Sequence, residues 1–330
     1  MGKIAVAEGD DWINRGMDLT INNRFDDAAE IFQKKISESK NNYKAYFYLS
    51  ATLNSKMTHF ENEQEKEQFE SAVDSTIKFT QNLLIESKNK PDSVKAELLF
   101  YQGSAYGYRA YFQGRNSQWY AALKNGIKAN SLLNEALETD STFYDAYFGI
   151  GTYKYWLSSK IKFILWLPFV SDTREEGIAF VKKAIEKNCN AKYMAMHQLI
   201  YILIDYGHFD EAIYYGEKVI EKYPESQFMW WAAAHAFFKK PDLENAELAY
   251  LKLEQLLSQD KNPNPTHILN CQLKLAKIYY ESGKTDLCLQ KSKKIISSEF
   301  YTQNNEKILE YIKEAKELYQ DCRELTGAKK

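Results

Sequence analysis

The fold of this chain is decided by the stretch WINRGMDLTINNRFDDAAEIF, which runs from Trp12 to Phe32. It predicts two helices, because small and large apolar residues recur at helical spacing in both halves. Gly16 in the first helix lets the second helix approach closely, and Ala28 in the second helix receives it. The sides of this contact are filled by large residues, namely Trp12, Leu19, Phe25 and Phe32.

The same pattern recurs along the chain at a period close to 34 residues. Tyr46 and Ser50 lie 34 residues after Trp12 and Gly16. Later units are marked by Leu99, Gly103 and Tyr106; by Tyr147 and Gly151; by Gly207, Phe209 and Ala212; by Trp230 and Ala246; and by Ala276, Tyr279, Gly283 and Cys288. Residues 304–325 are predicted to form one more amphipathic helix, which would cover the last apolar face.

This spacing resembles the tetratricopeptide pattern W-x2-L-G-x2-Y…A-x3-F, with Arg15 where leucine is usual. The resemblance implies an all-α, right-handed superhelical solenoid of about seven helix pairs with a C-terminal capping helix, because each pair buries its apolar stripe only against its neighbours. We predict one domain over residues 9–325, between a flexible or engineered N-terminus at 1–8 and a tail at 326–330. Irregular insertions are expected near residues 55–68, 107–125, 156–172 and 258–266.

Composition narrows the functional classes. The chain has 330 residues and a formal net charge of −2, which argues against a dedicated nucleic-acid binder. Apolar residues make up 45% of it, so a large core can be buried. No segment reaches the roughly 18 apolar residues that a membrane span needs. Ala5-Val6-Ala7 has the form of a signal-peptidase site and indicates an exported or periplasmic protein with Met1-Gly2 added; a cytoplasmic protein is the alternative.

Two stretches in the middle third, Trp119–Leu137 and Tyr147–Ile178, resemble the tetratricopeptide repeat protein 39 family, which includes the fungal inclusion-body-clearance proteins. The chain's many Tyr, Asn and Lys residues make it look more like a bacterial relative. The resemblance implies a helical-repeat protein without known catalytic residues, and no specific partner. It rests on Lys124, Gly126, Ile127 and Lys128; on Gly149 and Gly151; on the long apolar helix; and on Asp172, Arg174, Glu175 and Gly177.

Signals of catalysis and metal binding are weak. The sequence holds no GxGxxG, Walker, HExxH or GxSxG motif, so we expect no catalytic residue and no enzyme activity. His197 and His235 are both predicted to face inward, yet acidic or Cys partners are not evident, so we expect no metal and no cofactor. We interpret the cysteines as small buried hydrophobes, with a Cys271–Cys288 disulfide allowed but not required; they are Cys189, Cys271, Cys288 and Cys322.

Binding is the better-supported function. In a tetratricopeptide superhelix the first helix of each pair lines the concave face, and the helical period selects the residues that point inward. The candidates for a ring-rich groove are Phe148, Tyr155, His197, Tyr201, Phe228, Trp231, His235, Phe238 and Tyr280. The alternative is that insertions or the cap helix cover these rings. A carboxylate clamp is not expected, because its candidates Lys44, Asn54, Asn270 and Lys277 are not contiguous.

A second candidate surface lies in the extended third unit. Basic and aromatic residues interleave there and could hold an anion or the acidic face of a partner. The structural alternative, which we favour, is that the rings pack against the fourth unit while Arg and Lys extend along them. The residues are Arg109, Arg115, Trp119 and Lys124.

We therefore expect a non-catalytic scaffold or adaptor that binds a protein or peptide segment along the concave groove. The alternative is a carrier of an apolar small molecule or lipid inside an enclosed solenoid, which the ring density and the apolar insert favour. We expect no nucleic acid and no transmembrane segment. Peripheral membrane contact through Trp166, flanked by Lys160 and Lys162, is a lesser alternative.

The apolar insert KIKFILWLPFVSDTREEG, residues 160–177, is interpreted as a structural joint. It is predicted to end a long helix, from about Tyr144 to Leu167, with a turn at Pro168. Asp172 or Thr173 would then cap the next helix, and Gly177 would allow close packing. The residues expected to cover the junction with the third unit are Phe163, Leu165, Trp166, Phe169 and Val170.

Overall fold

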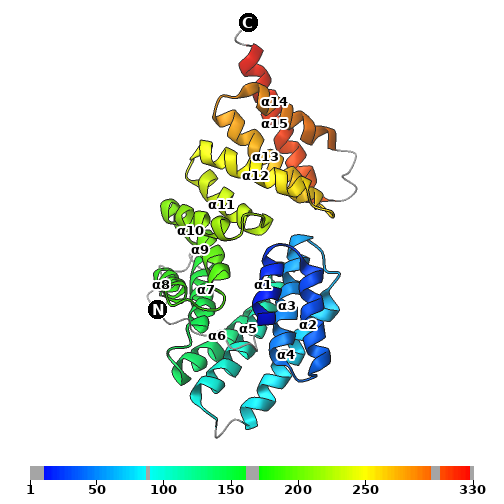
Figure 1. The fold of residues 1–330 in the computed structure, drawn as a ribbon. Coiled ribbons are helices and arrows are strands. Elements are labelled where there is room, and N and C mark those ends of the chain that lie inside the picture. The colour runs from blue at the N-terminus through cyan, green and yellow to red at the C-terminus, as the bar shows by residue number, and fades with distance from the viewer. Residues whose placement is uncertain (1–10, 87–89, 161–170, 299–304, 328–330) are drawn as a thin grey trace, which may run out of the picture. The chain divides into compact units, whose positions relative to one another are not determined.

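The computed structural model describes residues 11–86, 90–160, 171–298 and 305–327 (Figure 1). Contacts between Cα atoms divide the chain into two compact units, Met1–Ile202 and Leu203–Lys330, with the boundary inside α9. The first nine helices are α1 (Asp11–Ile21), α2 (Phe25–Glu38), α3 (Tyr43–His59), α4 (Lys66–Glu86), α5 (Asp92–Arg115), α6 (Trp119–Thr139), α7 (Tyr144–Lys160), α8 (Arg174–Glu186) and α9 (Lys192–Tyr206).

The remaining helices belong to the second unit and are α10 (Phe209–Lys222), α11 (Gln227–Lys239), α12 (Leu243–Ser258), α13 (Pro265–Glu281), α14 (Thr285–Ser297) and α15 (Glu306–Gly327). Over the described ranges the helices thus form seven consecutive pairs, α1/α2 to α13/α14, followed by α15. The prediction of an all-α solenoid of about seven helix pairs with a capping helix is confirmed. The prediction of a single domain over 9–325 stays a prediction.

The pairs pack closely because small residues stand where two helices cross. In α1, a Cβ atom built on Gly16 would lie 2.2 Å from the ring of Phe32, so the glycine makes room for that ring, while Ala28 is fully buried. Between α7 and α8 two glycines face each other. A Cβ atom on Gly151 would lie 2.6 Å from the carbonyl oxygen of Gly177, and one on Gly177 would lie 2.6 Å from the carbonyl oxygen of Gly151. The prediction that Gly177 allows close packing is confirmed.

Of the predicted insertions, the one near 107–125 consists mainly of the ends of two long helices, and the one near 258–266 is a short loop between helices. Over 107–125, α5 continues without a break to Arg115, and α6 begins at Trp119 after a short turn in which Ser117 has a φ of 59°. Over 258–266, α12 ends at Ser258 and α13 begins at Pro265. Asn264 caps α13 by accepting from the backbone N–H of Thr266 at 2.9 Å, and a proline at the first helical position suits that cap.

The apolar insert is described only at its two ends. Helix α7 runs from Tyr144 to Lys160, whereas the predicted extension to Leu167, the turn at Pro168 and the five apolar side chains Phe163, Leu165, Trp166, Phe169 and Val170 lie outside the described residues. Before α8, an Asp172 carboxylate oxygen accepts from the Arg174 backbone N–H at 3.0 Å. The Thr173 hydroxyl instead donates to the carbonyl of Lys154 at 3.0 Å, so the acceptor at this helix start is Asp172.

Ion pairs set the register between two second helices of the C-terminal unit. Lys284 at the start of α14 pairs with Glu247 of α12. One heptad later, Lys291 pairs with Glu254, with Nζ and Oε2 2.6 Å apart. We call these two contacts the α12–α14 ladder. Because both partners advance by seven residues, α14 runs alongside α12 in one defined register.

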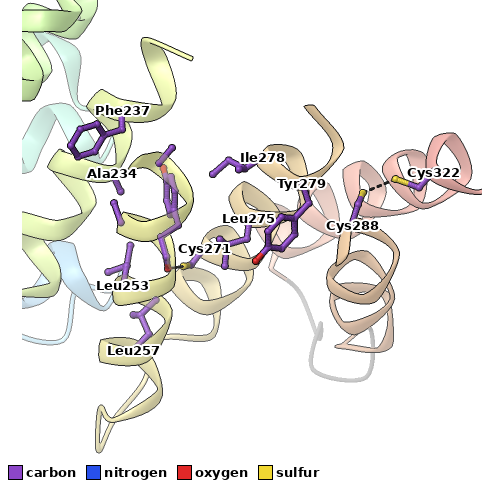
Figure 2. Packing of buried hydrophobic residues seen from close by; sticks show 13 residues of the cluster. Ala234, Phe237, Leu253, Leu257, Cys271, Leu275, Ile278, Tyr279, Cys288 and Cys322 are labelled. Atoms are coloured by element: carbon purple, nitrogen blue, oxygen red, sulfur yellow. Dashed lines mark hydrogen bonds between the residues drawn. The ribbon is translucent and has the colours of Figure 1, made fainter. Parts of the chain in front are cut away.

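Helix α15 caps the unit by covering α13 and α14 with one stripe. Ile308, Ile312 and Ala315 are buried on it, at the spacing of one helical face. Further along α15, Cys322 is also fully buried and lies in the cluster shown in Figure 2. The capping role predicted for residues 304–325 therefore holds for α15.

The interpretation of the cysteines as small buried hydrophobes is confirmed. All four cysteines are buried and reduced. The Cys271–Cys288 disulfide, which the sequence allowed but did not require, is not formed. The Cys271 thiol donates to the carbonyl of Tyr250 at 3.3 Å, while Cys288 lies against Cys322, with their Sγ atoms 2.7 Å apart (Figure 2). The sequence alone did not reveal the Cys288–Cys322 contact, because it depends on how α15 docks on α14.

The Gly151–Gly177 contact predicts a strong positional effect in glycine-to-alanine substitutions. Gly151→Ala should lower the free energy of unfolding by about 1–3 kcal/mol, because the new methyl group overlaps a backbone carbonyl. Gly107→Ala is a matched control inside α5, where the nearest atom to a new Cβ is the Ala129 Cβ at 3.9 Å. That substitution should raise stability by about 0.5–1 kcal/mol. Urea unfolding of both variants checks this, and equal effects would contradict the crossing geometry.

Candidate functional site

The strongest candidate surface lies in the C-terminal unit, on one stripe of α11. The helix begins at Ser226, whose hydroxyl accepts from the Met229 backbone N–H at 3.3 Å. Its alanines at 232, 233, 234 and 236 are fully buried, which fixes the face that packs inward. The half-buried side chains Trp231, His235 and Phe238 follow at i, i+4 and i+7 and share another face. Together with His267 and Lys274 of α13, we call them the α11–α13 face.

Aromatic contacts hold Trp231 in place. Its ring packs edge-on against Tyr250 of α12, with centroids 6.0 Å apart, and against His267 of α13, with centroids 5.9 Å apart. The indole Nε1 of Trp231 is buried and has no hydrogen-bond acceptor among the described residues. Its neighbour Trp230 differs, because its Nε1 donates to the carbonyl of Pro224 at 2.7 Å. Thus two adjacent indoles differ in whether their N–H group is satisfied.

A cation stands at the other end of the face. The Lys274 ammonium lies 4.9 Å from the centroid of the Phe238 ring, which is cation–π distance. Burial lowers the pKa of Lys274, and repulsion by Lys277 and Lys239 lowers it further. Glu314 of α15 opposes this effect but forms its ion pair with Lys277. Within the described ranges no carboxylate forms an ion pair with Lys274.

His235 lies between these two ends and is neutral at physiological pH. Burial lowers its pKa to about 4, and Lys274 and Lys239 add repulsion against a second positive charge. The face therefore carries its positive charge on lysine rather than on histidine. Sequence reasoning identified Trp231, His235 and Phe238 but missed Lys274. The signal was present, because Lys274 follows His267 by seven residues and so shares its side of α13.

The other groove candidates are dispersed. In the N-terminal unit, Tyr155 is fully buried beside Gly177 and is part of the core. His197 is 7% exposed and packs edge-on against half-buried Tyr201, with ring centroids 5.2 Å apart. Phe148 is half-buried on α7. In the C-terminal unit, Phe228 is half-buried on α11, and Tyr280 is 36% exposed on α13.

The second candidate surface divides into two parts. Arg109 forms an ion pair with Asp74 of α4, and Arg115 donates to the Thr58 hydroxyl at 2.8 Å. Both arginines are thus engaged by neighbouring helices. Trp119 is 68% exposed and Lys124 is also exposed on α6, so this ring does not pack against the fourth unit.

Within the described ranges, no three His, Cys, Asp or Glu side chains gather as a metal site would require. A search of the same ranges finds no helix long and apolar enough to cross a membrane. Neither finding alters the candidate face, which is built from the rings of Trp231 and Phe238, two imidazoles and one ammonium group.

The neutral state of His235 predicts a pH effect on stability. Its pKa is about 4 in the folded chain and about 6.5 in an unfolded one, so the unfolded state binds the proton more readily. The stabilisation is complete above pH 6.5 and is lost as the pH falls towards 4. Between pH 7.5 and 5, the native chain should lose about 2 kcal/mol more stability than His235→Gln. Urea unfolding measures this difference, with exposed His208→Gln as control; parallel pH profiles for native chain and His235→Gln would contradict it.

No protein-family model matches the chain, and no curated protein matches it. Solved structures do resemble it. The chain of the anaphase-promoting complex hetero-tetramer Cut9–Hcn1 aligns with a TM-score of 0.54 and 14% identity, over 96% of this chain and 56% of that one. A Rap protein complexed with competence and sporulation factor aligns with a TM-score of 0.50 and 13% identity, over 96% and 86%.

A third similar structure is the C-terminal part of a TPR repeat-containing protein from Cytophaga hutchinsonii, with a TM-score of 0.45 and 17% identity, over 91% of this chain and 98% of that one. At these identities the likeness concerns the fold alone. Together with the seven consecutive helix pairs of the described ranges, the likenesses to the Cut9–Hcn1 and Rap structures show an all-α helical solenoid.

Proposed function

We propose that this chain is a non-catalytic scaffold that binds a peptide or protein segment on the α11–α13 face. The observation that carries the proposal is the Trp231 indole N–H, which is buried and has no acceptor among the described residues. A buried donor without an acceptor costs about 1–3 kcal/mol, which a ligand carbonyl could recover. Half-buried rings beside such a donor are typical anchors in protein interfaces.

The charge of the face indicates the kind of segment. Lys274 lies among other lysines and on the Phe238 ring, and Glu314 is committed to Lys277. An acidic side chain of the ligand would supply the missing negative charge. Trp231 and Phe238 are seven residues apart, which is about 10 Å along a helix. An extended ligand spans that distance with about three residues.

Two properties of known proteins are in keeping with this proposal. The structurally similar Rap protein was solved with competence and sporulation factor bound, and helical solenoids in general offer extended binding surfaces.

We further propose that exposed Trp119 and Lys124 of α6 form a separate contact for an acidic partner. The residues from 98 to 134 include no Asp or Glu, which favours such a partner. The resemblance of the middle third to the tetratricopeptide repeat protein 39 family stays a prediction.

The Trp231 donor is tested by removing its N–H while keeping an aromatic ring. Random linear peptides displayed on phage are selected on the native chain, and a labelled selected peptide is titrated against the variants. Trp231→Phe should weaken binding by about fivefold, and Trp231→Ala by more, because the anchor itself is lost. Trp230→Phe is the matched control, since its N–H is satisfied within the chain, and it should leave affinity unchanged.

Equal affinity of the native chain, Trp231→Phe and Trp231→Ala would overturn the proposed face. A native mass spectrum offers an independent check of the alternative function. An apolar small molecule that accompanies the native chain but not Trp231→Ala would favour a carrier over a peptide-binding scaffold.

The role of Lys274 is tested with the same peptides. The selected sequences should be enriched in Asp or Glu. The substitution Lys274→Met should lower the affinity for a selected peptide by about tenfold. Replacing the peptide's Asp by Asn should weaken binding to the native chain but add little loss on Lys274→Met, because the two changes remove one interaction. Exposed Lys293→Met on α14 serves as control. The proposed role of Lys274 would be contradicted if the selected peptides were not enriched in acidic residues and bound Lys274→Met with native affinity.

A further inference from the structure

We propose that Cys288 and Cys322 form a thiol–disulfide modification site, at which a disulfide-bearing oxidant links the cap helix α15 to α14. The proposal is independent of the peptide-binding face. It rests on the position of the two sulfur atoms, on their burial and on the helices that carry them.

The two thiols are already close to bonding distance. Cys322 Sγ lies 2.7 Å from Cys288 Sγ, which is roughly 0.7 Å longer than a disulfide bond. Both side chains are fully buried, in a cluster that Tyr279 and Leu275 also line (Figure 2). Only a small movement would therefore join them, because their helices already pack against each other.

The surroundings make the pair slow to react in the packed state. Burial, together with the contact with Cys288, raises the pKa of the Cys322 thiol to about 12. The thiolate is the reacting species, so reaction requires α15 to open first. Over the described ranges α15 packs mainly on α13 and α14, and a helix held by one such stripe is suited to local opening. Once α15 repacks, the linked pair is enclosed again and protected from reduction.

The chemistry is thiol–disulfide exchange and is balanced by the oxidant. One cysteine thiolate attacks a sulfur of the oxidant RS–SR, forming a mixed disulfide and releasing RS⁻. The thiolate of the other cysteine attacks the protein sulfur of that mixed disulfide, forming the Cys288–Cys322 bond and releasing the second RS⁻. The two cysteines lose two electrons and two protons, and the oxidant leaves as two molecules of RSH.

The linkage would close a loop that contains the chain between α14 and α15. A bond across a loop of this length restricts the unfolded chain and stabilises the folded one. It would also prevent α15 from separating from α14. The chain offers two internal comparisons, because Cys271 and Cys189 are also buried, and the Cys271 thiol donates to the carbonyl of Tyr250 instead of to a cysteine.

The test uses the full chain and oxidised glutathione as the probe. After incubation, unreduced tryptic digests are analysed by mass spectrometry for a link between the peptides 285–291 and 317–323. We expect a linked species about 2 Da lighter than the sum of the two peptides, formed faster in a low urea concentration that opens α15. Cys288→Ser and Cys322→Ser should lack it, whereas Cys271→Ser and Cys189→Ser should retain it.

The consequence for α15 is measured on the same samples. Oxidation of the native chain should raise its melting temperature by about 5–10 °C and slow proteolysis within α15 by about tenfold. This readout uses the native chain, so it stands even if a serine variant fails to fold. The proposal is overturned if only glutathione adducts form, if links to Cys271 or Cys189 are equally abundant, or if the linked chain shows no protection of α15.

Discussion

The structure depends on how closely the two helices of a pair can approach. At the crossing of α7 and α8 the backbones themselves touch, since each glycine faces the carbonyl oxygen of the other. This contact brings the flanking stripes into register and buries Tyr155 and Val181 completely. Because a solenoid is stabilised by contacts within and between neighbouring pairs, an obstacle at one crossing would disturb both its own pair and the next.

The sequence predicted the helical pairs well because their cause is local. Spacings of small and large residues determine which faces meet, and the seven pairs and the cap follow directly from them. The site was predicted less well. The helical period placed Tyr155 on an inward face but could not show that α8 covers it. The period of α13 places Lys274 on the same side as His267, but it does not show that Phe238 of α11 meets that side. The Cys288–Cys322 contact likewise depends on which residues of two different helices become neighbours.

The α11–α13 face combines two unsatisfied groups in a surface that is otherwise stable. The Trp231 donor lacks an acceptor among the described residues, and burial and neighbouring lysines disfavour the charge on Lys274, so each group carries an energetic cost. The surrounding packing offsets that cost, because Tyr250 and the buried alanines of α11 hold the rings firmly. For the peptide that we propose, such an arrangement would reduce the entropy lost on binding, since the rings are already held in place.

The α12–α14 ladder has a consequence for how the chain avoids misassembly. Repeated helix pairs resemble one another, so a helix can dock on its neighbour one turn out of place during folding. If α14 slid by three or four residues along α12, Lys284 would face position 243, 244, 250 or 251, and Lys291 would face 250, 251, 257 or 258. Of these positions only Glu244 is acidic, so a shifted arrangement keeps at most one ion pair. The native register keeps both ion pairs, so the ladder favours it over registers shifted by one turn.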